Sequence, residues 1–303
     1  MEKTSLKKRN SLIEFYRFFF AMNVLICHGF FPVEMDFFGP DRISVEFFFV
    51  LSGYLFYHLF DRLCEMKTLE AVRFTLRAKL NPLLVPLLIG MASNAVLNVL
   101  SDHKPKIEVF RYLWYIPAML AILLLYAVLS TLIKNRKVFF IVIASLFVIA
   151  TLLRFSGNRT LFFFDYIRST SAVSLGILVA WIPKLPLRKK NLLWCVLLPL
   201  IATVFLMIFF HVAEENVGYE ALLDLVLYPL LVYLTFHMDF HFVPFDILGA
   251  LSFGIYAFQS PARLLDYIGT PSPWIPFGLI FVAAITEYLI RILIVKKRAE
   301  KKQ

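Results

Sequence analysis

Residues 15–31 read FYRFFFAMNVLICHGFF, and residues 44–60 read SVEFFFVLSGYLFYHLF. Both stretches are apolar and close to the length of about 20 residues that a membrane-spanning helix needs. The first nevertheless contains Arg17 and His28, and the second contains Glu46 near its start. Ionisable groups inside an apolar segment are costly to place in lipid, so they usually face the protein interior and mark a functional site. These two segments therefore predict both the class of fold and the position of the site.

The whole chain has the composition of an integral membrane protein. Of its 303 residues, 60% are hydrophobic and 17% are charged, and the mean hydropathy is +0.76. Apolar runs of about 20 residues recur from end to end, and no polar stretch is long enough to build the core of a soluble domain. We therefore expect a single membrane domain over residues 1–303, with no fused soluble domain.

The apolar runs predict an all-α membrane fold with about ten transmembrane helices. The expected segments are 12–31, 43–61, 80–100, 112–133, 138–153, 165–182, 191–211, 221–238, 244–262 and 274–294. The fifth and ninth segments are the shortest, so a different assignment of either one would give nine or eleven helices.

The distribution of positive charge predicts the orientation of the chain. With the N-terminus in the cytoplasm, 22 of the 31 Lys and Arg residues lie on the cytoplasmic side and 8 lie outside, Arg154 and Arg168 among them. Cytoplasmic loops are enriched in Lys and Arg, so both termini are expected in the cytoplasm. The net charge of +10 follows from this bias and from contact with anionic membrane lipid. No basic motif interleaved with aromatic residues indicates a nucleic-acid partner.

This topology places His28 and Glu46 at a similar, outer level of the membrane. At 1.5 Å per residue, His28 lies roughly 16 Å nearer the outer face than Arg17, and the second helix begins near Glu46. A carboxylate that accepts a hydrogen bond from one imidazole nitrogen makes the other nitrogen a better general base. Two further helices would bring residues to the same outer cavity, namely Trp114, Tyr115, Tyr256 and Gln259.

The cytoplasmic side carries a cluster of cations. Arg17 lies near the inner end of the first helix, and Arg77 and Lys79 lie just before the third. Converging cations suit phosphate groups, which arginine binds through two hydrogen bonds at once. The sequence thus predicts a phosphate-binding site inside and a His/carboxylate site outside. Such a pair would suit the passage of an activated group across the bilayer.

The same residues resemble a known family. Arg17 and His28 in one helix, SVEFFFVLSGYL from residue 44, LWYIPAML at 113–120 and LSFGIYAFQSP near the end are similar to the membrane acyltransferase-3 family. The resemblance covers nearly the whole chain. It implies a bacterial inner-membrane enzyme that transfers an acyl group, usually acetyl, from cytoplasmic acyl-CoA. The implied acceptor is a hydroxyl of a polysaccharide, glycolipid or related molecule of the cell envelope.

The resemblance also implies roles for individual residues. His28 matches the essential histidine of the family, Arg17 its partner arginine, and Glu46 an acidic position before paired phenylalanines. Acyl-CoA would place its phosphates near Arg17, Arg77 and Lys79. His28, oriented by Glu46, would then either deprotonate the acceptor hydroxyl or carry the acyl group transiently.

Four further positions are interpreted from the same comparison. Ser52 and Gly53 match a Ser-Gly step of the family, which we interpret as close helix packing, with Ser52 also a candidate for lining the cavity. Lys79 stands where the family has an arginine, and Gln259 stands where many members carry a histidine. A second proton-relay residue is therefore expected to be missing.

Two other interpretations remain open. A transporter or flippase would use Arg17, His28 and Glu46 to bind a polar or anionic solute, although the two halves of the chain show no internal repeat. A non-catalytic membrane partner with the same fold is the third interpretation. No pair of histidines has zinc-site spacing with a Cys or acidic partner, so no metal is expected.

Overall fold

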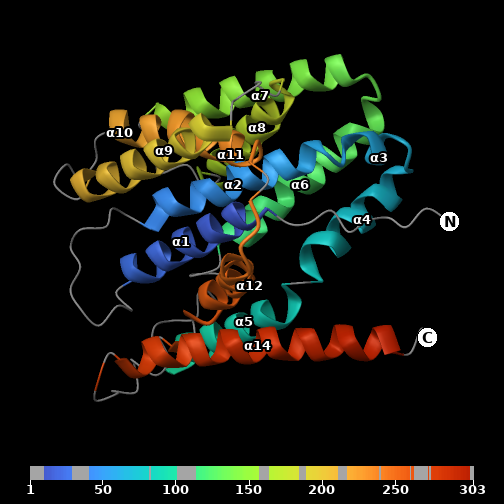
Figure 1. Ribbon diagram of the computed structural model, residues 1–303. Coiled ribbons are helices and arrows are strands. Elements are labelled where there is room, and N and C mark those ends of the chain that lie inside the picture. Colours follow the sequence, from blue (N-terminus) through green and yellow to red (C-terminus); the bar gives the residue numbers. More distant parts are fainter. Residues whose placement is uncertain are drawn as a thin grey trace.

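The chain is helical, with no β-strand, throughout the part that the structure describes (Figure 1). The computed structural model describes residues 10–28, 41–81, 83–100, 114–156, 164–183, 189–210, 217–238, 240–259, 261–262, 272 and 274–300. The all-helical class predicted from the sequence is confirmed.

Each of the ten predicted apolar segments is largely helical over the residues that the structure describes. Residues 29–31, 82, 112–113, 211 and 260 of these segments lie outside the described residues. Nine of them correspond to single helices: α1 (Ser11–Cys27), α2 (Asp41–Tyr57), α5 (Leu84–Leu100), α6 (Tyr115–Leu132), α7 (Arg136–Phe155), α8 (Phe164–Trp181), α9 (Lys189–Phe210), α12 (Val243–Ala257) and α14 (Trp274–Glu300). The segment 221–238 is instead a succession of α10 (Val217–Leu222), a π-helix η2 (Leu223–Leu227) and α11 (Tyr228–Thr235). Two further helices, α3 (Phe60–Cys64) and α4 (Thr68–Leu80), lie between α2 and α5 and overlap the predicted apolar segments only at their ends.

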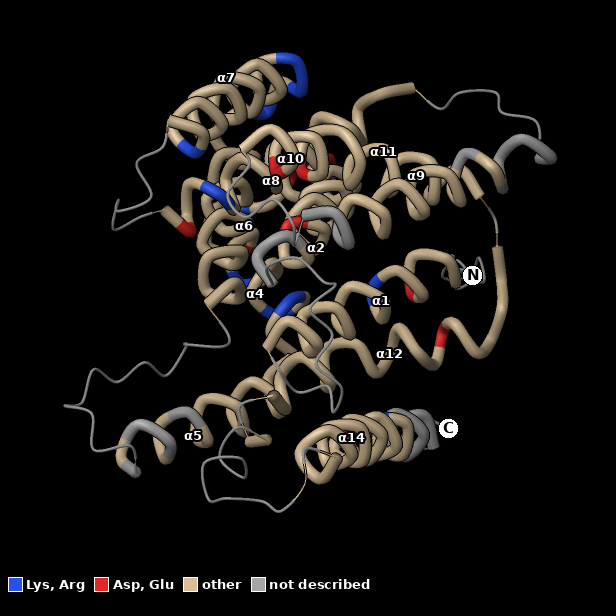
Figure 2. Tube along the Cα trace, turned by 90° about the vertical axis from the view of Figure 1, so that its left-hand side faces the viewer, with Lys and Arg blue, Asp and Glu red and all other residues tan. Residues whose placement is uncertain are grey.

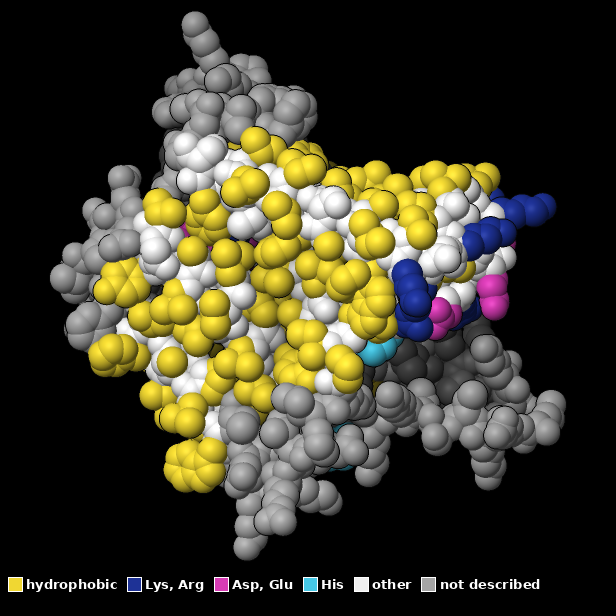
Figure 3. Space-filling view, turned by 90° about the horizontal axis from the view of Figure 1, so that it is seen from above, with side chains coloured by type: hydrophobic (Ala, Val, Ile, Leu, Met, Phe, Trp, Pro, Cys, Tyr) yellow, Lys and Arg dark blue, Asp and Glu magenta, His cyan; other side chains and the backbone are white. Residues whose placement is uncertain are grey.

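The described helices identify a membrane protein. Four are long and apolar enough to cross a bilayer by themselves: Tyr115–Leu132, Arg136–Phe155, Val217–Thr235 and Trp274–Ile294. The bent pair of α4 and the first part of α5 passes the same test when taken together. Figure 3 shows hydrophobic side chains over the face that includes α7, with Lys and Arg gathered at one end of it. The count of ten spans and the cytoplasmic location of both termini stay predictions.

The helices α2 and α8 make the most extensive contact in the bundle. A Cβ atom at Gly53 of α2 would overlap the backbone of Val173 in α8, and one at Gly176 of α8 would overlap the backbone of Val50 in α2. Small residues at a membrane helix interface allow two backbones to approach this closely. The structure therefore agrees with the interpretation of Gly53 as a packing residue.

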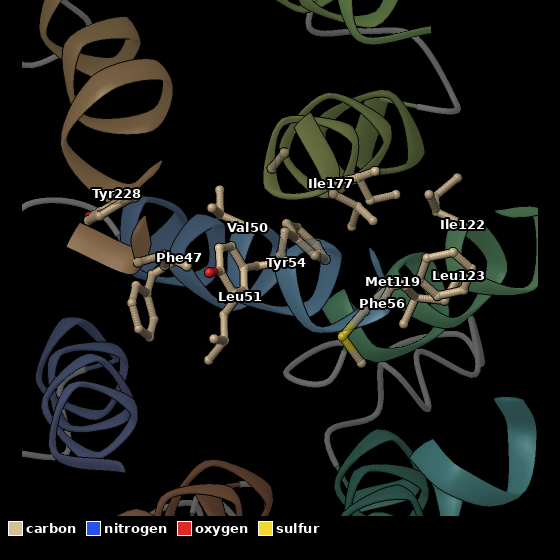
Figure 4. Close-up of a cluster of buried hydrophobic side chains, with 14 of the residues drawn as sticks. Phe47, Val50, Leu51, Tyr54, Phe56, Met119, Ile122, Leu123, Ile177 and Tyr228 are labelled. Carbon is tan, nitrogen blue, oxygen red and sulfur yellow. The ribbon is translucent and has the colours of Figure 1, made fainter. Parts of the chain in front are cut away.

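Side chains of α2 also fill the space between α2 and its other neighbours (Figure 4). Phe47 and Phe56 are completely buried, together with Leu123 of α6 and Tyr228 of α11. The ring centroids of Phe47 and Tyr228 are 6.3 Å apart. Since α2 touches α6, α8 and α11, packing on several sides fixes the position of this helix.

A second close pair consists of α1 and α12, and α14 covers α12. A Cβ atom at Gly249 of α12 would overlap Glu14 of α1. About one turn before Gly249 in α12, the ring of Phe245 stacks on that of Phe15 in α1, with centroids 4.5 Å apart. The end of α1 that leads to His28 therefore lies beside the end of α12 that leads to Gln259.

We predict that Gly176→Leu destabilises the bundle, because the added side chain has no space between α8 and the α2 backbone. Overpacking typically costs about 1–3 kcal/mol. The measurement is the thermal unfolding of the detergent-solubilised protein. Gly278→Leu is the control, since nothing lies within 4 Å of a Cβ built at Gly278. Equal unfolding temperatures for the two variants would contradict the packing argument.

Candidate active site

A cavity of about 800 Å³ lies between α1, α2, α4, α6 and α12. Five of the residues predicted for the site line it: Arg17, Ser52, Lys79, Tyr115 and Tyr256. From the sequence, these residues were expected in two separate sites, one at the inner and one at the outer side of the membrane. The structure places all five on the walls of one cavity, because α1, α4, α6 and α12 surround the same face of α2.

The cationic wall of the cavity is formed by α1 and α4. Arg17 Nη1 donates to Glu14 Oε2 at 2.7 Å, and Glu14 is buried where Gly249 allows α12 to approach. Lys79 is near enough to Arg17 for the two positive charges to act on each other. One carboxylate thus faces two cations, so this wall favours an anionic ligand. Glu14 was not predicted as a site residue, although it lies three residues before Arg17 inside the same apolar segment.

Two tyrosines form another wall of the cavity. The rings of Tyr115 and Tyr256 meet edge to face, with centroids 4.6 Å apart. Ser52 donates a hydrogen bond to the Met119 sulfur at 3.1 Å. Ser52 is only partly buried on the cavity wall, so it combines a packing contact with access to the cavity.

His28 is paired with Gln259 just beyond this wall. The distance from His28 Nδ1 to Gln259 Oε1 is 2.5 Å, and Gln259 is completely buried. Because an amide oxygen only accepts, the assigned amide orientation puts the proton on Nδ1 and makes Nε2 the basic nitrogen. Gln259 follows Tyr256 by three residues, roughly 4.5 Å along a helix axis. The imidazole therefore lies about one helical turn beyond the tyrosines.

Glu46 does not form the expected pair with His28. Its Oε1 atom accepts from Arg168 Nη2 at 2.7 Å and Arg168 Nε at 2.9 Å, and it lies 3.2 Å from Arg154 Nη2. Glu46 is completely buried, and both arginines are at most 3% exposed. The predicted Glu46–His28 pair is therefore wrong, and the reason is helix packing. Glu46 faces these arginines because α2 lies against α8, and α7 lies against α8 in turn. In the structure His28 Nδ1 contacts Gln259 instead.

The arginines extend the cluster to η2 and α10. Arg154 also pairs with Asp224 of η2 and, at 2.8 Å, with Glu220 of α10. Figure 2 shows acidic residues, in red, where α2, α8 and α10 meet. We call Glu46, Arg154, Arg168, Glu220 and Asp224 the ionic network. In the part of the chain that is described, no group of three or more His, Cys, Asp and Glu side chains is placed to hold a metal ion.

Besides His28, Gln259 and Glu46, two further predicted site residues, Trp114 and Arg77, do not line the cavity. The Trp114 ring is 5.1 Å from the Arg168 guanidinium carbon, so it covers the ionic network. Arg77 lines a separate groove on α4, whereas Lys79 lines the cavity. The predicted group of Arg17, Arg77 and Lys79 is therefore divided between two sites.

The ionic network could have been predicted in part from the sequence. Arg168 and Asp224 lie inside predicted apolar segments, as Glu46 does, and ionisable groups at such positions indicate buried partners. Arg154 and Arg168 were instead expected among the positive charges outside the membrane. The π-helix that carries Asp224 was not predictable from hydrophobic periodicity, and such irregular turns are frequent at functional sites.

Comparison with known proteins identifies one family. A family model described as an acyltransferase domain, that of acyltransferase family 3, matches residues 10–290. The match includes α1, the ionic network, the cavity and most of α14. No curated protein and no solved structure matches the chain significantly.

We predict that Arg154→Leu strongly destabilises the protein, because it leaves the buried carboxylate of Asp224 without its arginine partner. Removal of one member of a buried ion pair typically costs about 3–5 kcal/mol. Arg136→Leu, in the same helix, removes an exposed arginine that lies 3.6 Å from Asp61. Such surface pairs are worth about 0–1 kcal/mol. Thermal unfolding in detergent measures both variants, and a loss of similar size in each would contradict the assignment of the network as a structural centre.

Proposed function

Because this chain belongs to the membrane acyltransferase-3 family, we propose that it transfers an acyl group, acetyl in the first instance, from cytoplasmic acyl-CoA to a hydroxyl group. The acceptor is an envelope polysaccharide, glycolipid or related molecule at the outer face of the bacterial inner membrane. Family membership establishes a membrane acyltransferase, and the donor, the acyl group and the acceptor are what we propose. The supporting observation is a cavity that extends from two cations to tyrosines beside a paired histidine.

The cavity suits a ligand with an anionic end and a long, mostly uncharged arm. Arg17 and Lys79 would face phosphate oxygens, and Ile13, Leu51 and Met119 would contact the arm. A volume of about 800 Å³ is within the range of cavities that bind small molecules and cofactors. The thioester of acyl-CoA would then approach the tyrosines, with His28 one turn further along α1 and α12.

The His28–Gln259 pair supports two related mechanisms. In the first, His28 Nε2 takes the proton of the acceptor hydroxyl while the hydroxyl oxygen attacks the thioester carbonyl. The CoA thiolate then leaves and is protonated by the imidazolium. In the second, Nε2 attacks the carbonyl and the CoA thiolate leaves; the acceptor oxygen then attacks the acylimidazole, and the proton of the hydroxyl passes to the thiolate. Gln259 has the same role in both, since its oxygen keeps the proton on Nδ1. The Tyr115 hydroxyl is a candidate donor to the developing oxyanion.

Glu46 has an indirect role in this proposal. It holds Arg154 and Arg168 and thereby ties α2 to α7 and α8, while its Oε2 atom is buried without a hydrogen-bond partner. We propose that Glu46 positions the helix that carries Ser52 and does not touch the reacting atoms. A transporter would instead need the same residues to bind solute on a path through the protein.

We predict that His28→Ala lowers acetyl transfer by about 10²–10⁴-fold, the usual contribution of a positioned acid–base group. The assay follows labelled acetyl from acetyl-CoA into the envelope glycans of membranes that contain equal amounts of each variant. His241→Ala is the matched control, since His241 is exposed and does not line the cavity. Unchanged transfer by His28→Ala would refute the proposed centre. Absence of transfer with any acyl donor, together with His28-dependent solute uptake by vesicles, would favour a transporter.

We also predict different pH profiles for two changes at Gln259. In Gln259→Glu a carboxylate would stabilise the imidazolium of His28, so the acidic limb of the rate profile should move to higher pH. In Gln259→Leu the amide oxygen that accepts from Nδ1–H is removed, so the rate should fall by about 10-fold or more across the whole profile. The measurement is the rate of acetyl transfer against pH. An unshifted acidic limb in Gln259→Glu would contradict the pairing.

A further inference from the structure

A basic groove runs along α3 and α4, outside the cavity. Its volume is about 700 Å³, and its polar lining consists of four cations, one acid and one amide: Arg62, Lys67, Arg73, Arg77, Glu70 and Asn81. Among the described residues, no ion pair joins Glu70 to these cations. All four cations are exposed, so their charge is available to a ligand. The groove therefore favours a ligand that carries several negative charges.

The groove also offers an apolar surface. The guanidinium carbon of Arg62 lies 4.4 Å from the centroid of the Phe74 ring. This contact holds Arg62 on one wall, and Phe74 and Met66 add apolar area beside it. A planar ring with phosphates attached would match both parts of this lining better than a free inorganic anion would.

The groove and the cavity are adjacent compartments. Arg77 lines the groove, Lys79 lines the cavity, and Ala78 lines both. Two residues apart on an α-helix correspond to roughly 200° of rotation, so Arg77 and Lys79 project to different sides of α4. The small side chain of Ala78 stands between the two compartments. One ligand can therefore occupy the groove with its charged end and extend past Ala78 into the cavity.

We infer that this groove binds the 3′-phosphorylated adenosine of the acyl donor, with its 3′-phosphate on Arg62 and Arg73. The 5′-diphosphate then passes Ala78 to Arg17 and Lys79, and the acyl arm extends into the cavity. This inference rests on the proposed function and adds a binding site to it. An anionic phospholipid headgroup offers the same phosphate chemistry but no nucleotide and no 3′-phosphate. A donor that lacks only the 3′-phosphate therefore separates the two sources.

The test compares the binding of acetyl-CoA and acetyl-dephospho-CoA to the full-length protein in phosphatidylcholine nanodiscs, by calorimetry. The double variant Arg62→Gln/Arg73→Gln should weaken acetyl-CoA binding by about tenfold or more, since hydrogen bonds to charged groups are strong. It should change the binding of acetyl-dephospho-CoA much less. Lys137→Gln removes an exposed cation outside the groove and should bind both donors as the unmodified protein does.

Three results would overturn the inference: equal weakening for both donors, no binding of either donor by the unmodified protein, or loss of discrimination when phosphatidylglycerol is included in the nanodisc. The last result would assign the groove to a lipid headgroup. Calorimetry measures donor binding and needs no acceptor. Binding in the groove can therefore fail while acetyl transfer in membranes succeeds, and acetyl transfer can fail while binding in the groove succeeds. The two failures are therefore distinguishable.

A second variant tests the connection between the compartments. Ala78→Trp should obstruct the acyl arm and weaken acetyl-CoA binding by about tenfold or more, while the groove still binds adenosine 3′,5′-bisphosphate, which has no arm. Retention of full acetyl-CoA affinity by Ala78→Trp would show that the donor does not pass between groove and cavity at this residue.

Discussion

The contact between Glu46 and two buried arginines constrains the rest of the bundle. Charges taken out of water must be paired with good geometry, and the Glu46 carboxylate lies within 3.2 Å of both Arg154 and Arg168. These residues belong to α2, α7 and α8, and Asp224 adds the π-helix η2. The four elements are therefore held at one level. The reciprocal close approach of Gly53 and Gly176 fixes the α2–α8 distance from the same interface.

This arrangement gives α2 two different faces. One face carries Glu46 into the ionic network, and another carries Ser52 and Leu51 to the cavity wall. Glu46 and Ser52 are six residues apart, which on a helix of 3.6 residues per turn places them on different sides. Glu46 is therefore unavailable to His28, and Gln259 at the end of α12 takes its place. The structural charge cluster and the chemical site share a helix without sharing residues.

The helix α4 makes a similar division among the cytoplasmic cations. Arg77 faces the groove and Lys79 faces the cavity, so positive charge is present at two successive points beside one small residue, Ala78. A positive-inside bias explains why Lys and Arg are abundant in this segment. This bias does not explain why Arg77 and Lys79 face two adjacent compartments. One is the groove, which has Phe74 on its wall, and the other is the cavity, which leads toward His28.

Much of this protein was determined by local properties of the sequence. Apolar length predicted where the helices lie, and the cost of charge in lipid selected Arg17, His28 and Glu46 as unusual. The spacing of these residues, with SVEFFFVLSGYL, indicated the family. Only the tertiary structure decided which ionisable and polar groups meet. His28, Glu46, Arg154, Arg168 and Gln259 were all compatible with one membrane level, so depth alone permitted several pairings. The actual pairs depend on which helices are neighbours and which sides they present, and those follow from contacts between residues far apart in the chain.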